Sequence, residues 1–116
     1  MKTWMRVLFT AGLCAVLIGT VASAAENLTV RTYRSFPDRG LLAVYLHGVH
    51  KGFLLMNADL EARGQTPVFC LPADLELGAT DVIKMLDHLI SLLPTPNNVA
   101  IEVVLLDGFR HRFPCQ

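Results

Sequence analysis

Histidine and cysteine are the two residue types in this sequence that could carry chemistry at a defined spacing. His47 and His50 stand at positions i and i+3, which places two imidazoles on one turn of a helix. Such a pair can hold a transition metal when a third ligand arrives from elsewhere. Nothing in the sequence brings His88, His111 or an acidic residue to it. We therefore favour a solvent-facing pair beside a packed Tyr45, and we predict no metal site.

Cys70 and Cys115 lie in similar settings, Phe69-Cys70-Leu71-Pro72 and Phe113-Pro114-Cys115. In an exported chain a pair of cysteines is interpreted first as a disulfide. The alternatives are an intermolecular bridge and a redox-active cysteine, but the two residues are not in the Cys-x-x-Cys spacing typical of redox sites. We predict a Cys70–Cys115 disulfide that ties the middle of the chain to its last residues.

The sequence contains no recognisable catalytic motif. The nucleophile elbow, the Ser-x-x-Lys pair, the zinc-binding His-Glu-x-x-His and the phosphate-binding loop are all absent. Asp87 and His88 are adjacent, and adjacent side chains on a helix do not face each other. Cys70 is the best candidate nucleophile, but a disulfide would consume it. We predict that the protein is not an enzyme and uses no cofactor.

The first 24 residues have the three parts of a secretory signal peptide. Lys2 and Arg6 form a positive region, residues 7–19 are apolar, and Ala22-Ser23-Ala24 offers the small residues that a signal peptidase reads. A membrane anchor is the alternative, but the apolar run is shorter than the roughly 20 residues needed to span a bilayer. We predict cleavage after Ala24, with cleavage after Ala25 as the alternative, and a periplasmic location.

Residues 25–116 have the length of one small domain with a modest core. The loss of Lys2 and Arg6 leaves two more acidic than basic residues. A mildly acidic protein lacks the electrostatic footprint of proteins that bind nucleic acids or anionic membranes. We predict a single domain over residues 25–116, with no nucleic-acid partner and no membrane contact after cleavage.

Apolar residues at three- and four-residue steps predict three helices, over about 37–62, 77–93 and 99–112. Gly64 ends the first, and Asn97 or Asn98 offers a cap for the third. We expect the first helix to bury Leu42, Tyr45, Val49, Gly52, Phe53, Met56 and Leu60. We expect an apolar side on the second helix, formed by Val82, Met85, Leu86, Leu89, Leu92 and Leu93. We expect the third to bury Ile101, Val104, Leu105, Gly108 and Phe109.

Two segments leave room for other structure. Residues 26–36 alternate weakly, so a short strand or an extended arm is open there. Residues 103–106 resemble a strand, but the length of the segment and its caps favour a helix. The predicted fold is all-α, a small disulfide-stapled bundle of three to four helices.

Tyr45, Gly48 and Gly52 lie at helical spacing on the first predicted helix. A glycine inside a helix costs roughly 1 kcal/mol relative to alanine, so two of them need compensation. We predict that all three residues pack against another helix, with a close approach of its backbone at the glycines.

The ordered motifs Tyr45-x-x-Gly48-x-x-x-Gly52, Phe69-Cys70-x-Pro72 and Phe113-Pro114-Cys115, with a leucine-rich helix ending at Pro94, follow the signal peptide. From Tyr45 to Cys115 the chain resembles the Rap/Tai family, immunity proteins paired with type VI secretion amidase effectors. Members are small, exported, all-helical proteins that block the active-site cleft of peptidoglycan amidases in the periplasm. They are often dimeric, so the resemblance also allows a homodimer. It matches Cys70 and Cys115 to the family's C-terminal cysteine pair.

The chain departs from this family at three places. The stretch from Gly40 to Leu46 is more apolar than expected of a relative. Many relatives have a second cysteine pair, and one of its positions reads Leu42-Ala43-Val44 here. Gly108-Phe109 also stands where Ala-Leu is usual. The resemblance does not transfer the toxin-binding loops. We place the amidase contact on exposed connectors, at residues Asp59, Glu61, Arg63, Gln65, Thr95, Asn97 and Asn98.

A second function also fits the composition. Small disulfide-bonded helical proteins of the periplasm include acid chaperones, which expose apolar surface when the pH falls. The four histidines and ten acidic residues of this chain could respond to such a change. The alternative prediction is therefore a periplasmic stress or acid-chaperone-like helical protein with no amidase partner.

Overall fold

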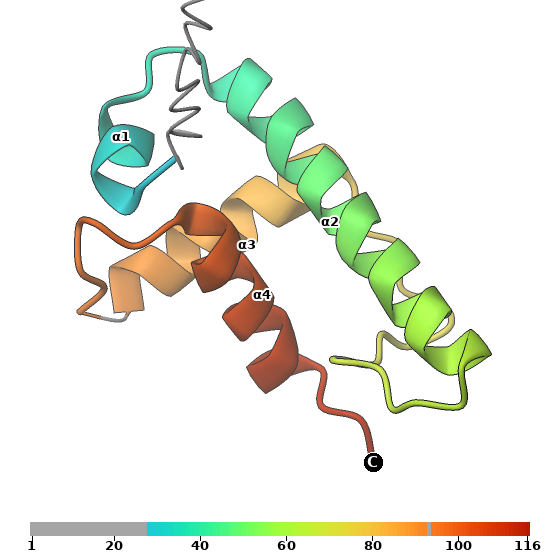
Figure 1. Cartoon of the computed structure of the whole chain (residues 1–116). Coiled ribbons are helices and arrows are strands. Elements are labelled where there is room, and N and C mark those ends of the chain that lie inside the picture. Colours follow the sequence, from blue (N-terminus) through green and yellow to red (C-terminus); the bar gives the residue numbers. More distant parts are fainter. Residues whose placement is uncertain (1–27, 93) are drawn as a thin grey trace, which may run out of the picture.

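The computed structural model describes residues 28–92 and 94–116, and these residues form four α-helices. They are α1 (Val30–Ser35), α2 (Arg39–Ala62), α3 (Ala79–Leu92) and α4 (Ile101–Arg112). α2 packs against α3, and α3 packs against α4. Figure 1 shows α2 along one side of the molecule, with α1, α3 and α4 on its inner side.

The predicted all-α, disulfide-stapled bundle is confirmed. The predicted signal peptide, residues 1–24, lies outside the described residues. Within the described part of the chain, no helix combines the length and the apolar character that crossing a membrane requires.

α2 begins and ends where the sequence predicts. The Asp38 carboxylate accepts a hydrogen bond of 2.9 Å from the N–H of Leu41, which satisfies a free donor of the first turn. At the other end Gly64 has φ 70°, a left-handed conformation that favours glycine. The N–H of Gln65 then donates to the carbonyl of Leu60 at 2.8 Å. The direction in which the chain leaves α2 is therefore fixed by its own backbone.

Residues 30–35, within the segment left open between a strand and an extended arm, form the short helix α1. The hydroxyl of Thr29 caps it by accepting a hydrogen bond of 3.3 Å from the N–H of Thr32. Thr29 also makes an isolated antiparallel bridge with Ala100. Val30 and Tyr33 are buried, so the segment belongs to the core.

α4 begins at Ile101, and its cap is Ala100, which makes no side-chain hydrogen bond. The prediction that Asn97 or Asn98 caps this helix is wrong. The physical reason is that the segment before α1 supplies the acceptor: the N–H of Ile101 donates to the carbonyl of Leu28 at 2.9 Å. A backbone partner from the other end of the described chain therefore replaces the local side-chain cap.

The face of α2 that packs on the core also differs from the expected one. Leu42, Leu46, His50 and Asn57 are its buried residues. Of the residues expected to be buried, only Leu42 is among them, while Tyr45, Gly52 and Met56 are exposed. The face of α2 that packs on the core is therefore rotated about the helix axis from the predicted face. One core unites all four helices: Val30, Tyr33, Leu42, Leu46, Phe69, Val82, Ile83, Leu86, Ile90, Ile101, Val104, Leu105 and Phe109.

The connector between α2 and α3 is held in two ways. The predicted disulfide joins Cys70 to Cys115, with a Cα–Cα distance of 5.0 Å. Beside it, the buried amide of Asn57 donates to the carbonyl of Phe69 at 2.7 Å and accepts from the N–H of Val68 at 2.9 Å. A buried amide without partners is costly, so this pairing explains a polar residue in the core. The connector is tied to both α2 and the end of the chain.

The predicted close approach at Gly48 and Gly52 does not occur within the described chain. Both glycines are exposed, and a Cβ added to either would meet no atom within 4 Å. Tyr45 is 43 % exposed, and its contact with another helix is a hydrogen bond from its hydroxyl to Glu102 of α4. The close approach lies instead at Gly108, where a Cβ would stand 2.2 Å from Cδ1 of Leu89. This glycine lets α4 sit against α3.

Candidate functional site

The residues predicted to bind a partner fall on two separate connectors. Asp59 and Glu61 lie in the last turn of α2, and Arg63 and Gln65 follow it; all four are exposed. Asp59 and Arg63 form an ion pair with each other at i and i+4. Such exposed pairs contribute little to stability, so both charges are available to a partner at modest cost.

The second connector, residues 94–98, is held against α1. The backbone oxygen of Asn97 accepts a hydrogen bond of 3.0 Å from the N–H of Arg31. Its side-chain oxygen accepts one of 2.8 Å from the guanidinium of Arg34. Asn98 is exposed, and Thr95 is partly buried. The structure therefore gives Asn97 a positioning role in a well-anchored connector.

Figure 1 places the two connectors far apart: one follows the free end of α2, and the other joins α3 to α4 on the opposite side of the molecule. They do not form a single surface. A partner that binds one connector would have to be large to reach the other, so we consider each as a separate candidate.

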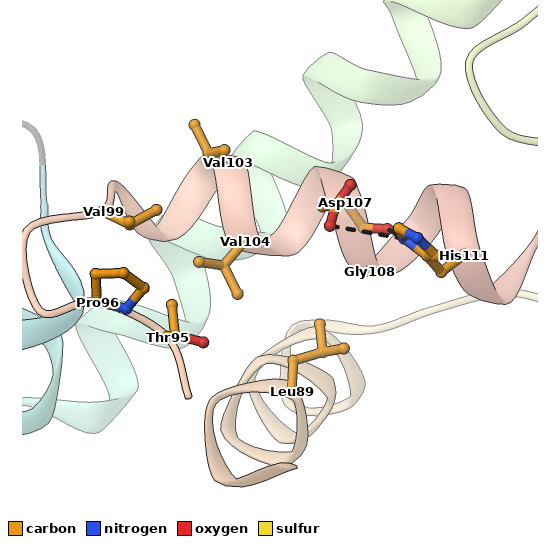
Figure 2. Close-up of a pocket in the computed structure, with 9 residues that line it drawn as sticks. All are labelled: Leu89, Thr95, Pro96, Val99, Val103, Val104, Asp107, Gly108 and His111. Carbon is orange, nitrogen blue, oxygen red and sulfur yellow. Dashed lines mark hydrogen bonds and ion pairs between the residues drawn. The ribbon is translucent and has the colours of Figure 1, made fainter. Parts of the chain in front are cut away.

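A groove lies beside the 94–98 connector and was not predicted. Its volume is about 560 Å³, within the range of ligand pockets. Figure 2 shows Leu89 reaching from α3 toward Val104 and Gly108 of α4, with Thr95 and Pro96 closing one end. The lining residues are Leu89, Thr95, Pro96, Val99, Val103, Val104, Asp107, Gly108 and His111.

Two apolar side chains, one near the start of α4 and one at the end of α3, are strongly exposed. Val103, which lines the groove, is 59 % exposed, and Leu92, at the end of α3, is 65 % exposed. Leu92 was expected on the buried side of its helix, and that expectation is wrong. α3 ends at Leu92, so no further helical turn covers this residue. Val103, with Val99 and Pro96, makes the groove apolar near the connector.

The other end of the groove is polar. Nδ1 of His111 lies 2.8 Å from the backbone oxygen of Asp107 and 3.6 Å from its carboxylate. Both side chains are exposed, one helical turn apart on α4. An apolar channel with a polar group at one end can orient a peptide side chain. Gly108, which stands where the resembled family usually has alanine, is the residue in the sequence that points to this site. The glycine allows the close packing of α3 and α4 that shapes the groove.

The two histidines of α2 occupy different environments. His50 is 1 % exposed, and its ring stacks on Phe109 with centroids 5.1 Å apart. The expectation of a solvent-facing pair is therefore wrong for His50. The His47 and His50 rings are 6.2 Å apart, and Nδ1 of each is buried without a hydrogen-bond partner among the described residues. The same residues include no group of three or more His, Cys, Asp or Glu side chains able to hold a metal ion.

The burial of His50 has a consequence for stability. Burial lowers the pKa of His50 below its ordinary value of 6.5, and Lys51 and His47 lower it further. The unfolded chain therefore takes up a proton at this residue at a higher pH than the folded chain does. The stabilisation is present above about pH 6.5 and is lost as the pH falls toward the lowered pKa.

We expect the free energy of unfolding, measured by urea denaturation at steps between pH 7.5 and pH 5, to fall with pH in the wild type. His50→Phe keeps a ring on Phe109 but cannot titrate, so its loss over this range should be smaller. His88→Gln, on the exposed surface of α3, is the matched control and should follow the wild type. Equal losses in the wild type and His50→Phe would contradict this account.

A second polar cluster links α1, α2 and α3. The hydroxyl of Tyr33 donates to Asp87 at 2.7 Å, and the guanidinium of Arg39 binds both oxygens of Asp87 at 2.8 and 2.7 Å. Arg39 also lies over the Tyr33 ring, 4.8 Å from its centroid. Burial, with the hydrogen bond to Asp87, raises the pKa of Tyr33 above its ordinary value. A phenol that is harder to ionise is a poor acid or nucleophile, so we assign this cluster to helix docking.

Comparison with protein-family models, with curated proteins and with solved structures found no match.

Proposed function

We propose that the protein is an exported immunity-type protein that binds a type VI secretion peptidoglycan amidase in the periplasm and blocks its active-site cleft. The sequence motifs from Tyr45 to Cys115 are the first support, through their resemblance to the Rap/Tai family. The groove with exposed Val103 beside the 94–98 connector is the observation that carries the proposal.

The connector has the properties that an inhibitory contact needs. Its hydrogen bonds to Arg31 and Arg34 hold Asn97 before a partner arrives, so little conformational freedom is lost on binding. The exposed side chains of Leu92 and Val103 offer apolar area for the centre of an interface. In this proposal the connector enters the amidase cleft, while the groove receives a side chain from the rim of that cleft.

The test is inhibition of the amidase effector encoded in the same genome, preferably by a neighbouring gene. Purified mature protein should bind it and abolish hydrolysis of peptidoglycan at a stoichiometric ratio. Val103→Glu places a charge at the apolar rim and should weaken binding by ~100-fold, because an unpaired carboxylate would be buried. Glu61→Lys, on the other connector, is the matched surface control and should bind as the wild type does.

Three outcomes decide between the candidate surfaces. Loss of inhibition in Val103→Glu alone supports the groove, whereas loss in Glu61→Lys alone moves the contact to the end of α2. If the wild type neither binds nor inhibits any amidase from its own genome, the proposed function is wrong. The proposed export is checked separately, by sequencing the N-terminus of the protein from a periplasmic fraction, where we expect Ala25.

One observation favours a second function, that of a periplasmic acid-responsive protein. His50 lies inside the core and stacks on Phe109, so its protonation would introduce a charge at the contact between α2 and α4. Loosening that contact would expose apolar side chains. An apolar dye should then bind as the pH is lowered from 7 to 4, and aggregation of a client protein should be suppressed only in acid. The absence of dye binding over this range would exclude the second function.

A further inference from the structure

A second cavity lies between α2 and the segment that leads into α3. Its volume is about 360 Å³, within the range of ligand pockets. One wall is a single stripe of α2, formed by His47, His50, Lys51 and Leu54, which share one face of the helix. The facing wall comes from the 71–78 segment. The cavity and the groove have no lining residue in common, so they are separate candidate sites.

The wall that faces α2 is held in place before any ligand binds. The disulfide at Cys70 fixes the start of this segment to the end of the chain. Further along, the N–H of Leu75 donates to the carbonyl of Pro72 at 3.0 Å, and the N–H of Gly78 donates to the carboxylate of Asp81 at 2.9 Å. A small molecule would therefore bind with little loss of conformational freedom in the protein.

The two imidazoles in the lining have polar atoms without partners. His50 is 1 % exposed, and Nδ1 of both His47 and His50 is buried with no hydrogen-bond partner among the described residues. Such an atom costs free energy until something pairs with it. The pKa of His50 is lowered chiefly by burial, so at neutral pH its ring is neutral and offers one donor and one acceptor. A ligand that carries both donors and acceptors can pair with it in either tautomer.

The charged side chains in the lining are opposite in sign. Lys51 lies on α2 and Glu76 on the facing wall, and both are exposed. Within the described part of the chain, neither side chain forms an ion pair or a hydrogen bond. A lone anion would be repelled by Glu76 and a lone cation by Lys51, whereas a molecule with both charges can pair with each. This arrangement favours a zwitterion.

The rest of the lining is largely aliphatic. Four partly buried leucines contribute to it: Leu54, Leu71, Leu75 and Leu77. An aliphatic side chain placed against them removes apolar area from water on both partners. We propose that this cavity binds a zwitterionic α-amino acid with an aliphatic side chain. Its carboxylate pairs with Lys51, its ammonium group pairs with Glu76, and its polar atoms lie against the two imidazoles.

A metal ion fits the same cavity less well. The rings of His47 and His50 lie 6.2 Å apart. Glu76 does not complete a ligand set with them, because the described residues contain no group of three or more His, Cys, Asp or Glu side chains able to hold a metal ion. An ion would also leave the leucines without an apolar partner.

Titration calorimetry of the mature, oxidised protein with L-leucine at pH 7.5 should give a dissociation constant on the order of 0.1 mM, because the ligand is small. Two analogues remove one charge each. 4-Methylpentanoate lacks the ammonium group and 3-methylbutylamine lacks the carboxylate, so each should bind ~10-fold more weakly than leucine. Equal affinity for leucine and either analogue would contradict a zwitterion site.

Two variants assign the charged contacts. Glu76→Gln should weaken leucine binding by ~10-fold but should not weaken 4-methylpentanoate, which has no ammonium group. Lys51→Gln should weaken leucine to a similar extent but should not weaken 3-methylbutylamine. Glu61→Gln and Lys84→Gln, exposed and outside the cavity, are the matched controls and should bind leucine as the wild type does. Wild-type affinity for leucine in Glu76→Gln or Lys51→Gln would show that the assignment is wrong.

Nitrogen NMR of the imidazole rings locates the ligand. Leucine should shift the ring signals of His47 and His50 and leave those of His88, which is exposed on α3 and outside the cavity, unchanged. This experiment is independent of the proposed function, because leucine binding and amidase inhibition can each fail without the other. Unchanged His47 and His50 signals at 10 mM leucine would overturn the inference.

Discussion

Replacing Cys70 and Cys115 together with serine is expected to lower the free energy of unfolding by about 4 kcal/mol. The bond closes a loop whose ends are 45 residues apart, and the loss of that constraint lets the unfolded chain explore many more conformations. The free energy of unfolding of a small domain is only about 5–15 kcal/mol. Removal of the disulfide therefore brings the protein close to its unfolding threshold at 37 °C.

Urea denaturation of the oxidised wild type and the double variant measures this difference directly. Reduction of the wild type with a phosphine should give the same loss, whereas the same treatment should leave the double variant unchanged. This control separates the bond itself from the effect of the serine side chains. A difference below 1 kcal/mol would mean that other contacts already hold the two segments together. The hydrogen bond of 2.8 Å from the N–H of Cys70 to the carbonyl of Phe113 is the nearest such contact.

The three longer helices could be predicted because their signals are local. Periodic apolar residues define each helix, and Gly64, Pro94 and Pro114 mark where the chain cannot continue one. α1 could not be predicted in this way, because six residues are too few to show a helical period. Its conformation depends on distant partners, namely the bridge from Thr29 to Ala100 and the docking of Tyr33 on Asp87.

The prediction of which face of α2 is buried is wrong, and the reason is physical. Apolar side chains lie on both faces of this helix: Leu42 and Leu46 are buried, whereas Val44 and Leu55 are exposed. Periodicity does not single out a buried face when both are apolar. Polar residues were also assumed to face solvent, so His50 was misplaced.

The candidate site was predicted only in part. The 94–98 connector can be predicted as a binding segment because exposed loops often carry function. The groove beside it depends on how α3 and α4 pack against each other. That contact rests on Gly108 and Leu89, which lie 19 positions apart in the sequence. No local pattern reveals such a pair. The helical period predicts that Gly108 and Phe109 are buried, which is confirmed, and the departure from the usual Ala-Leu marks the same two positions. Neither signal indicates that Leu89 is the partner of Gly108.

Phe109→Ala should be the most damaging single substitution in the described core, with a loss of about 3–5 kcal/mol. The Phe109 side chain is fully buried, and its ring stacks on His50 at 5.1 Å and on Phe69 at 4.9 Å. It also contacts Phe53 by an edge, with centroids 6.3 Å apart, and it lies 6.1 Å from Phe113. The Phe109 ring thus connects α4 to α2, to the connector that carries Cys70, and to the segment after α4 that carries Cys115.

Thermal and urea denaturation of three variants would test this role. Phe109→Leu keeps most of the volume and restores the residue usual in the resembled family, so it should lose less than Phe109→Ala. Val103→Ala, an exposed position on the same helix, should change the free energy of unfolding by at most about 0.5 kcal/mol. A loss below 1.5 kcal/mol in Phe109→Ala would show that the core collapses around the missing ring.

The aromatic residues that contact Phe109 lie next to the two cysteines of the disulfide in the sequence. Phe69 precedes Cys70 and Phe113 lies two positions before Cys115, so the aromatic cluster and the bond restrain the same two segments. Residues that share partners do not act independently. The triple variant, with Phe109→Ala and both cysteines replaced by serine, should therefore lose less than the sum of the two separate losses. A fully additive result would show that the ring stabilises the helices without help from the bond.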